Sequence, residues 1–181
     1  MALRNLRMED DHILRRISKP VTEIDDKIIQ LLEDMEQTMR HHNGVGLAAV
    51  QVGSLKRIVV FDVSDDGDEL VEMINPVIIS TEGTQQNKEG CLSIKASREG
   101  YFRSGLVDRP EKTVVRAMDR FGKEFEIEAE GFKSIALNHE IDHLNGVLYT
   151  DKAHQMYEEA EEDDDESDTP RARRRRKRHE K

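Results

Sequence analysis

The chain has 181 residues, one cysteine, no tryptophan and a formal net charge of −10. Its length suits a single domain, and its acidic balance argues against a DNA-binding protein, which would normally carry a basic surface. A lone cysteine cannot form an internal disulfide, which favours a reducing compartment. Residues 1–12 lack the apolar stretch of a secretory signal, and no apolar run approaches the ~20 residues that span a bilayer. We therefore expect a cytoplasmic protein without a membrane segment.

Charged residues concentrate at the C-terminal end. Residues 158–181 contain 10 acidic and 8 basic side chains, and such a segment has too few apolar groups to offset the entropy of ordering a chain. We therefore expect residues 1–157 to form one catalytic domain and residues 158–181 to be a disordered tail.

Helical periodicity dominates the first part of the chain. Apolar side chains recur at helical spacing over residues 22–42, which predicts an N-terminal amphipathic helix. Thr22 followed by Asp25 resembles a capping box and places the start of the helix there. A shorter helix is expected over residues 10–17, because Pro20 would end it.

Strand patterns follow. They predict strands over residues 57–63, 70–74, 77–80, 112–118 and 123–129, the last two joined by a hairpin at residues 119–122. Helical spacing returns over residues 132–145, with Gly146 as a stop signal. Since strands and helices do not alternate, this order predicts an α+β fold with mainly antiparallel strands rather than a doubly wound parallel sheet.

The last predicted helix carries the motif His139-Glu140-Ile141-Asp142-His143. Histidines at positions i and i+4 lie one turn apart on one face and can share a metal ion, and Glu140 beside them can handle the proton of a water there. The strands would then pack around a C-terminal metal-binding helix. The alternative is a pair of ordinary buried histidines, with Glu140 as a surface charge.

A metal site of this kind needs a third protein ligand. The extended peptidase motif places a third histidine downstream, where this chain has Tyr149. Upstream lies Glu89-Gly90-Cys91-Leu92-Ser93, and a thiolate from Cys91 would suit zinc or iron(II). The alternative for Cys91 is a small buried apolar residue.

The third segment of interest is Gly44-Val45-Gly46-Leu47-Ala48-Ala49-Val50-Gln51. Its glycines allow a ligand to approach the backbone closely, and the Gln51 amide is a neutral donor suited to an oxyanion. The spacing does not match a phosphate-binding loop. The alternative is a helix-to-strand turn with small packing residues.

Together, the three motifs in this order resemble the peptide deformylases, and the resemblance extends over residues 10–150. It implies a small α+β domain around one divalent metal ion, iron(II) in the cell, with zinc, nickel or cobalt as substitutes. It assigns Cys91, His139 and His143 as ligands, with a water as the fourth. It also makes Glu140 the general acid and base.

The resemblance implies further roles around the metal. Gln51 and the backbone N–H of Leu92 would meet the developing oxyanion. Arg109 would pair with Asp142 behind the ligands. The residues that would bind substrate are Val45, Gly46, Gly90, Phe132, Ile135 and Ala136.

The implied reaction removes the formyl group from N-formyl-methionine at the N-terminus of nascent polypeptides and releases formate. Because such chains emerge at the ribosome, a contact between the basic residues 171–178 and ribosomal RNA is a further hypothesis. Its alternative is a tail in which the acidic residues fold onto the basic ones.

The chain departs from the family pattern in three places. Lys95 stands where many bacterial members carry a proline, residues 95–108 form a longer stretch than in compact members, and Asn138 replaces a common glutamine. The first two concern the rim of the substrate cleft. Two other classes stay open from the residues alone: a zinc peptidase built on the histidine motif, and a non-enzymatic module stabilised by metal.

Overall fold

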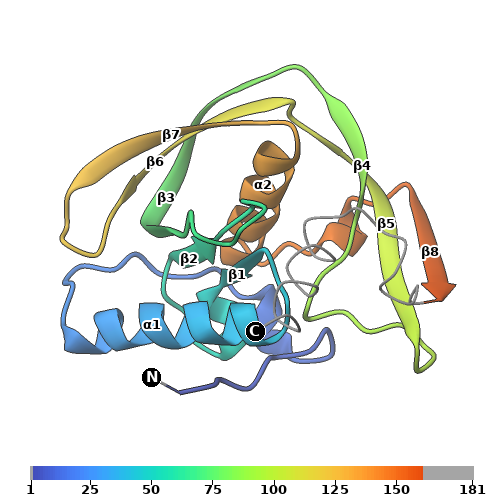
Figure 1. Cartoon of the computed structure of the whole chain (residues 1–181), viewed down its shortest axis with the longest axis horizontal. Helices are drawn as coiled ribbons and strands as arrows, with labels where there is room; N and C mark the ends of the chain where they lie inside the picture. The colour runs from blue at the N-terminus through green and yellow to red at the C-terminus, as the bar shows by residue number, and fades with distance from the viewer. Residues whose placement is uncertain (1, 161–181) are drawn as a thin grey trace.

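The structure is a computed structural model and describes residues 2–160. Within these residues it consists of two antiparallel sheets and two α-helices (Figure 1). The larger sheet contains β1 (Gly46–Ala48), β2 (Ile58–Phe61), β3 (Val71–Glu82), β6 (Lys112–Met118) and β7 (Glu124–Glu130). The smaller sheet contains β4 (Gln85–Glu89), β5 (Tyr101–Arg109) and β8 (Gln155–Ala160). The expectation of an α+β fold with mainly antiparallel strands is confirmed.

The second helix, α2 (Phe132–Leu144), lies in the middle of the molecule and contacts strands of both sheets (Figure 1). Ten of its thirteen residues are buried, as expected for a helix that is enclosed on several sides rather than amphipathic. At its C-terminal end, the C=O of Leu144 accepts from the N–H of Ser18 at 2.8 Å and from Arg57 Nη1 at 3.5 Å. The position of α2 lets Glu89 of β4 and Cys91 in the turn after it reach its histidines.

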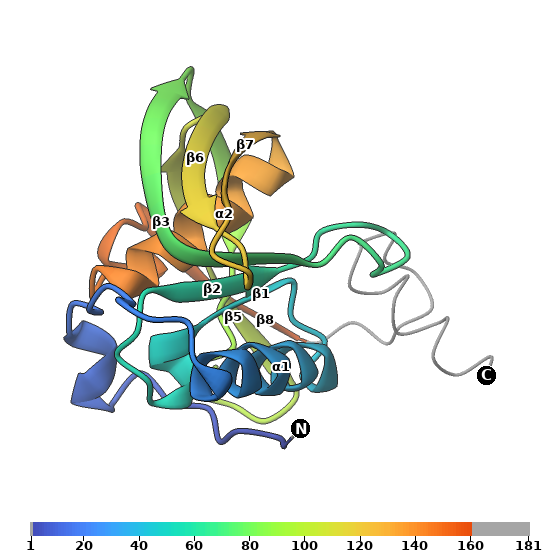
Figure 2. The ribbon, with the colours of Figure 1, turned by 90° about the vertical axis from the view of Figure 1, so that its left-hand side faces the viewer.

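The first helix, α1 (Asp26–His41), lies on the other side of β1 and β2, so that these strands separate the two helices (Figure 2). Its buried apolar side chains are Ile28, Leu31, Leu32, Met35 and Met39. Neither helix in residues 2–160 is long and apolar enough to cross a membrane.

The predicted start of the first helix at Thr22 is wrong. The helix begins at Asp26, and the capping residue is Asp25, whose carboxylate accepts from the N–H of Ile28 at 3.0 Å. The side-chain amide of Asn75 bonds both the N–H and the C=O of Val21 at 2.8 Å and so joins the segment before the helix to β3. An aspartate is a stronger N-cap than a threonine, which favours a start at Asp25 over one at Thr22.

Two other local predictions are also corrected. The expected helix over residues 10–17 is a short 3₁₀ helix, His12–Arg15. The two strands expected over residues 70–74 and 77–80 form one strand, β3, with an irregularity at Asn75, where φ is +55°. Asn75 can adopt this conformation at low cost, so the chain bends there without leaving the sheet.

The expected domain boundary after residue 157 falls inside β8. Residues 158–160 pair with β5, with Glu158 opposite Arg103 and Ala160 opposite Tyr101. Main-chain pairing therefore orders a segment that has almost no apolar side chains. Residues 161–181, which contain the rest of the expected tail, lie outside the described part of the chain.

Candidate metal centre and catalytic cleft

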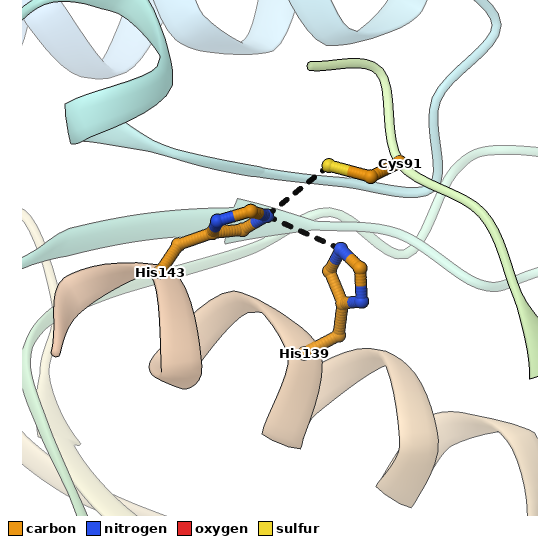
Figure 3. Close-up of side chains that lie close together, drawn as sticks. All are labelled: Cys91, His139 and His143. Atoms are coloured by element: carbon orange, nitrogen blue, oxygen red, sulfur yellow. Dashed lines mark hydrogen bonds between the residues drawn. The ribbon is translucent and has the colours of Figure 1, made fainter. Parts of the chain in front are cut away.

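Three potential metal ligands converge between α2 and the segment that follows β4 (Figure 3). His139 and His143 lie one turn apart on α2, and Cys91 approaches them from the turn after β4. The Nε2 atoms of the two histidines are 3.2 Å apart, and Cys91 Sγ lies 3.3 Å from His143 Nε2. All three ligand atoms lie within 4.8 Å of one another.

This donor set fits a divalent metal ion. Two imidazole nitrogens and one thiolate are ligands that zinc and iron(II) accept. His139 uses its Nδ1 for a hydrogen bond with Glu89 at 2.8 Å, which leaves Nε2 available for the metal. Three protein ligands leave one position of a tetrahedral site open, as a catalytic rather than a structural site requires.

Behind His139 lies a buried network of charges. Arg109 donates through Nε and Nη2 to the two carboxylate oxygens of Glu89 at 2.6 and 2.9 Å, and through Nη1 to Asp142 at 2.5 Å. Burial opposes the ionisation of Glu89, but the hydrogen bonds from Arg109 and His139 lower its pKa to about 2. A permanently ionised Glu89 fixes the orientation of the His139 ring.

Glu140 lies in the cleft beside the histidines and is 5 % exposed. Its carboxylate packs against Gly46 of β1, where any Cβ atom would collide with it. Burial raises the pKa of Glu140 to about 7, and its Oε2 has no hydrogen-bond partner within the described chain. The glycine at residue 46 therefore leaves the space that the Glu140 carboxylate occupies.

Both polar atoms of the Gln51 side-chain amide form hydrogen bonds that fix its position. Its Oε1 accepts from the N–H of Ala48 at 2.8 Å, and its Nε2 donates to Ser93 Oγ at 3.1 Å and lies 3.5 Å from Cys91 Sγ. Leu92 follows Cys91 in the turn and lines the cleft. The predicted oxyanion donors therefore lie next to the predicted thiolate ligand.

The cleft has a volume of about 850 Å³. All six residues that the sequence analysis assigned to substrate lie along it: Val45, Gly46, Gly90, Phe132, Ile135 and Ala136. At Gly90 the reason for the glycine is steric, because a Cβ atom would overlap the ring of Phe102. The structure thus brings Cys91, His139, Glu140, Gln51 and the pocket residues to one cavity, and His143 contacts the first two of them.

A family model for polypeptide deformylase matches residues 3–159. The chain belongs to this family. It is 48% identical over 161 residues to the peptide deformylase of Caldicellulosiruptor bescii, covering 89% of this chain and 92% of that one. It is 52% identical to the peptide deformylase of Thermoanaerobacter pseudethanolicus, covering 89% and 96%. The crystal structure of peptide deformylase from Thermotoga maritima superposes with a TM-score of 0.78 at 36% identity, covering 86% of this chain and all of that one.

The deformylase site includes two contributors to which the sequence analysis assigned no role. Glu89 bridges Arg109 and His139, and Tyr149 stacks on His139 with ring centroids 6.1 Å apart. The role of Glu89 could have been predicted from the sequence, because Glu89 lies two residues before Cys91 and metal-bound histidines commonly donate to a carboxylate. The role of Tyr149 could not have been predicted, because its stacking on His139 depends on the path of the chain after α2.

Proposed function

We propose that the chain removes the formyl group from N-formyl-methionine at the start of nascent polypeptides, with Glu140 transferring the proton. The observation that carries this proposal is the position of Glu140: it is buried in the cleft, next to three convergent metal ligands, with one carboxylate oxygen unpaired among the described residues. A water held there would lie within reach of a proton acceptor. This proposal makes Cys91, His139 and His143 the metal ligands.

The side chains around the cleft have different roles in the proposed reaction. When bound, the metal supplies Lewis-acid polarisation. Glu140 takes a proton from the attacking water and returns it to the departing amine. The Gln51 amide and the Leu92 backbone N–H donate to the oxygen on which negative charge develops. Because Gln51 is already held by Ala48 and Ser93, little reorganisation is needed when that charge forms.

The substrate would lie along the cleft with its methionine against α2. Val45, Phe132, Ile135 and Ala136 line the cleft where the methionine side chain would bind. The Gly46 backbone would hold the main chain of the substrate. A formyl group is too small to confer selectivity by itself, so recognition falls on the methionine side chain and the main chain. Iron(II) is the metal that we propose for the cell, with zinc, nickel or cobalt able to occupy the same ligands.

The third ligand also separates this function from a zinc peptidase. Cys91 supplies it from upstream, whereas the extended peptidase motif requires a histidine at the position of Tyr149. Here the Tyr149 hydroxyl donates to the backbone oxygen of Arg103 at 3.2 Å. A peptidase would cleave internal bonds of an unformylated peptide. An unformylated peptide is therefore the second substrate in the test.

The test compares Glu140→Ala with the intact chain. We expect the variant to bind metal and remain folded while formate release from formyl-Met-Ala-Ser falls by about 10²–10⁴-fold, the range of general acid–base groups. Glu126→Ala, which removes an exposed glutamate of β7, is the matched control and should retain full activity. Near-normal turnover by Glu140→Ala would overturn the assignment of Glu140, and equal cleavage of an unformylated peptide would overturn the function.

We also propose that residues 171–178 contact ribosomal RNA, which places the enzyme with nascent chains in the cytoplasm. Seven of these eight residues are basic, and neutralising phosphates would release counterions, so affinity should fall steeply with added salt. Truncation after Ala160 leaves β8 intact. It should lower ribosome affinity while turnover of a free formyl-methionyl peptide stays unchanged. Equal ribosome affinity with and without the tail at low salt would reject this contact.

A further inference from the structure

One wall of the cleft is a segment without regular secondary structure. Residues 95–100, here called the rim segment, follow the metal-binding turn and lead into β5. All six line the cleft, and five of them are exposed. His139 and Glu140 are buried residues that line the same cavity, together with Cys91. A peptide whose first residue reaches these side chains would therefore bring its later residues close to the rim segment.

The rim segment is tied to the C-terminal strand at Ser97. Glu158 of β8 accepts two hydrogen bonds from this one residue: from the backbone N–H of Ser97 to Oε1 at 2.9 Å, and from its hydroxyl to Oε2 at 2.6 Å. Hydrogen bonds to an ionised carboxylate are stronger than neutral ones. These bonds from Ser97 also lower the pKa of Glu158, so the carboxylate is ionised near neutrality.

The strand that carries Glu158 is itself well supported. It pairs with β5 along its length, and the next residue, Glu159, forms an ion pair with Lys88 of β4 at 2.6 Å. The Lys88 ammonium also lies 4.2 Å from the ring centroid of Tyr157. The Glu158 carboxylate is therefore presented by a strand that is joined to both other strands of the small sheet.

The rim segment has few other means of holding one conformation. It contains no proline, and Gly100 lies at a φ of +75° with no neighbouring atom where a Cβ would stand. Arg98 packs over the ring of Tyr101, the first residue of β5, with 5.5 Å between its guanidinium carbon and the ring centroid, so this contact joins only the C-terminal end of the segment to the sheet. Fixing such a segment costs conformational entropy, which the two bonds to Glu158 help to offset.

We propose that Glu158 is a positioning residue that holds the rim segment against the cleft through Ser97, and that this contact sets the affinity for the residues that follow the formyl-methionine of the substrate. This inference rests on the proposed deformylase function. It adds to that function a specificity element contributed by the C-terminal strand. Glu158 touches no reacting atom, so it acts on binding and not on the chemical step.

The first measurement does not depend on activity. The rim segment contains two tryptic sites, after Lys95 and after Arg98, and their cleavage reports how often the segment leaves its position. In the full chain, Glu158→Ala should speed cleavage at these sites by about two- to ten-fold, the factor implied by the net contribution of hydrogen bonds. Ser97→Ala removes one of the two bonds and should give a smaller increase.

The second measurement separates binding from chemistry. For formyl-Met-Ala-Ser, Glu158→Ala should raise KM by about two- to ten-fold and leave kcat unchanged. The double variant with Ser97→Ala should be no worse than Glu158→Ala alone, because both substitutions break one contact. Asp108→Ala is the control: it removes another carboxylate of the small sheet, one bonded to Gln86 and His154, neither of which lines the cleft.

Unchanged tryptic cleavage in Glu158→Ala would overturn the proposal, because the segment would then not depend on this contact. Faster cleavage with an unchanged KM would overturn the claim about substrate, and a fall in kcat at constant KM would assign Glu158 a different role. If the intact chain released no formate at all, the proposed function would fail, while the cleavage measurement would still decide whether Glu158 holds the segment.

Discussion

At the scale of single residues, the site depends on the carboxylate of Glu89, which forms hydrogen bonds with both Arg109 and His139. Glu89 accepts from Arg109 and bonds His139 Nδ1, and it is 5 % exposed. A buried charge of this kind is tolerated only because each of its oxygens is paired. The same pairing selects the histidine tautomer that offers Nε2 to a metal.

Replacing Glu89 with Gln should weaken metal binding by about 10–100-fold, the effect typical of a lost carboxylate partner of a metal-bound histidine. The physical reason is that a neutral amide orients His139 less strongly and leaves Arg109 with Asp142 in place of two carboxylate partners. Competition with a chelator measures the affinity. Asp108→Asn, at a surface ion pair with His154, is the control. Identical metal affinity in the Glu89 variant would contradict this role.

Cys91→Ser tests the thiolate directly. A hydroxyl is a poorer ligand than a thiolate for zinc or iron(II), so metal occupancy or activity should drop by about ten-fold or more. Metal analysis of protein purified without oxygen is the appropriate measurement. Full occupancy together with full activity would show that Cys91 is not a ligand.

At the scale of elements, the approach of β5 to the metal-binding turn depends on a residue without a side chain. Gly90 lies between Glu89 and Cys91, and the Phe102 ring of β5 occupies the space that a Cβ would need. Cys91 follows the end of β4 after one residue, Gly90. Any displacement of Gly90 would therefore move Cys91 relative to α2.

Gly90→Ala should therefore lower the free energy of unfolding by about 1–3 kcal/mol, as overpacking of a filled site usually does. Urea unfolding with intrinsic tyrosine signals or circular dichroism measures it. Combining Gly90→Ala with Phe102→Leu should recover part of the loss, since the smaller side chain leaves room for the methyl group. Additive losses in the double variant would show that the two residues do not compete for space.

At the scale of the whole molecule, the N-terminal segment connects α1 to the segment that carries Gln51. Asp34 of α1 accepts from the N–H of Ala2 at 2.7 Å and from Arg4 Nε at 2.8 Å. Further along, the N–H of Arg7 donates to the backbone oxygen of Gln51 at 2.8 Å. Residues 2–7 therefore add polar contacts to the apolar packing between α1 and the 3₁₀ turn that carries Gln51.

The Asp34 contacts should make stability depend on pH. Burial opposes ionisation, but the hydrogen bonds from Ala2, Arg4 and Gln30 lower the pKa of Asp34 below its ordinary value of 3.8. The resulting stabilisation is present above that value and is lost as the pH falls through the lowered pKa of the folded state. Asp34→Asn should thus be less stable than the intact chain at pH 7, by about 1–3 kcal/mol.

The difference between Asp34→Asn and the intact chain should narrow as the pH falls below 3.8, because the unfolded chain takes up a proton at Asp34 before the folded protein does. Urea unfolding of both proteins at a series of pH values provides the comparison. A difference that stays constant down to the acid limit would show that ionisation of Asp34 does not stabilise the fold.

Periodicity and local motifs by themselves predicted α2 and the hairpin between β6 and β7, whereas most of the residues that line the cleft were predicted through the resemblance to the peptide deformylases. The reason is that two histidines one turn apart, or apolar residues alternating with glutamates, are constrained by local geometry alone. The same local information failed at Thr22, because the carboxylate of Asp25 caps the helix three residues later.

Only the tertiary structure decided the small sheet and what it contributes to the site. The residues of β4 and β8 are mostly polar or charged, so their strands arise from main-chain pairing with β5 and not from a burial pattern. That pairing brings Glu89 to Arg109, twenty positions along the chain, and Glu158 to Ser97, sixty-one positions away. Neither contact could be read from the sequence, because it depends on which strands become neighbours, and that choice is made by the packing of the whole chain around α2.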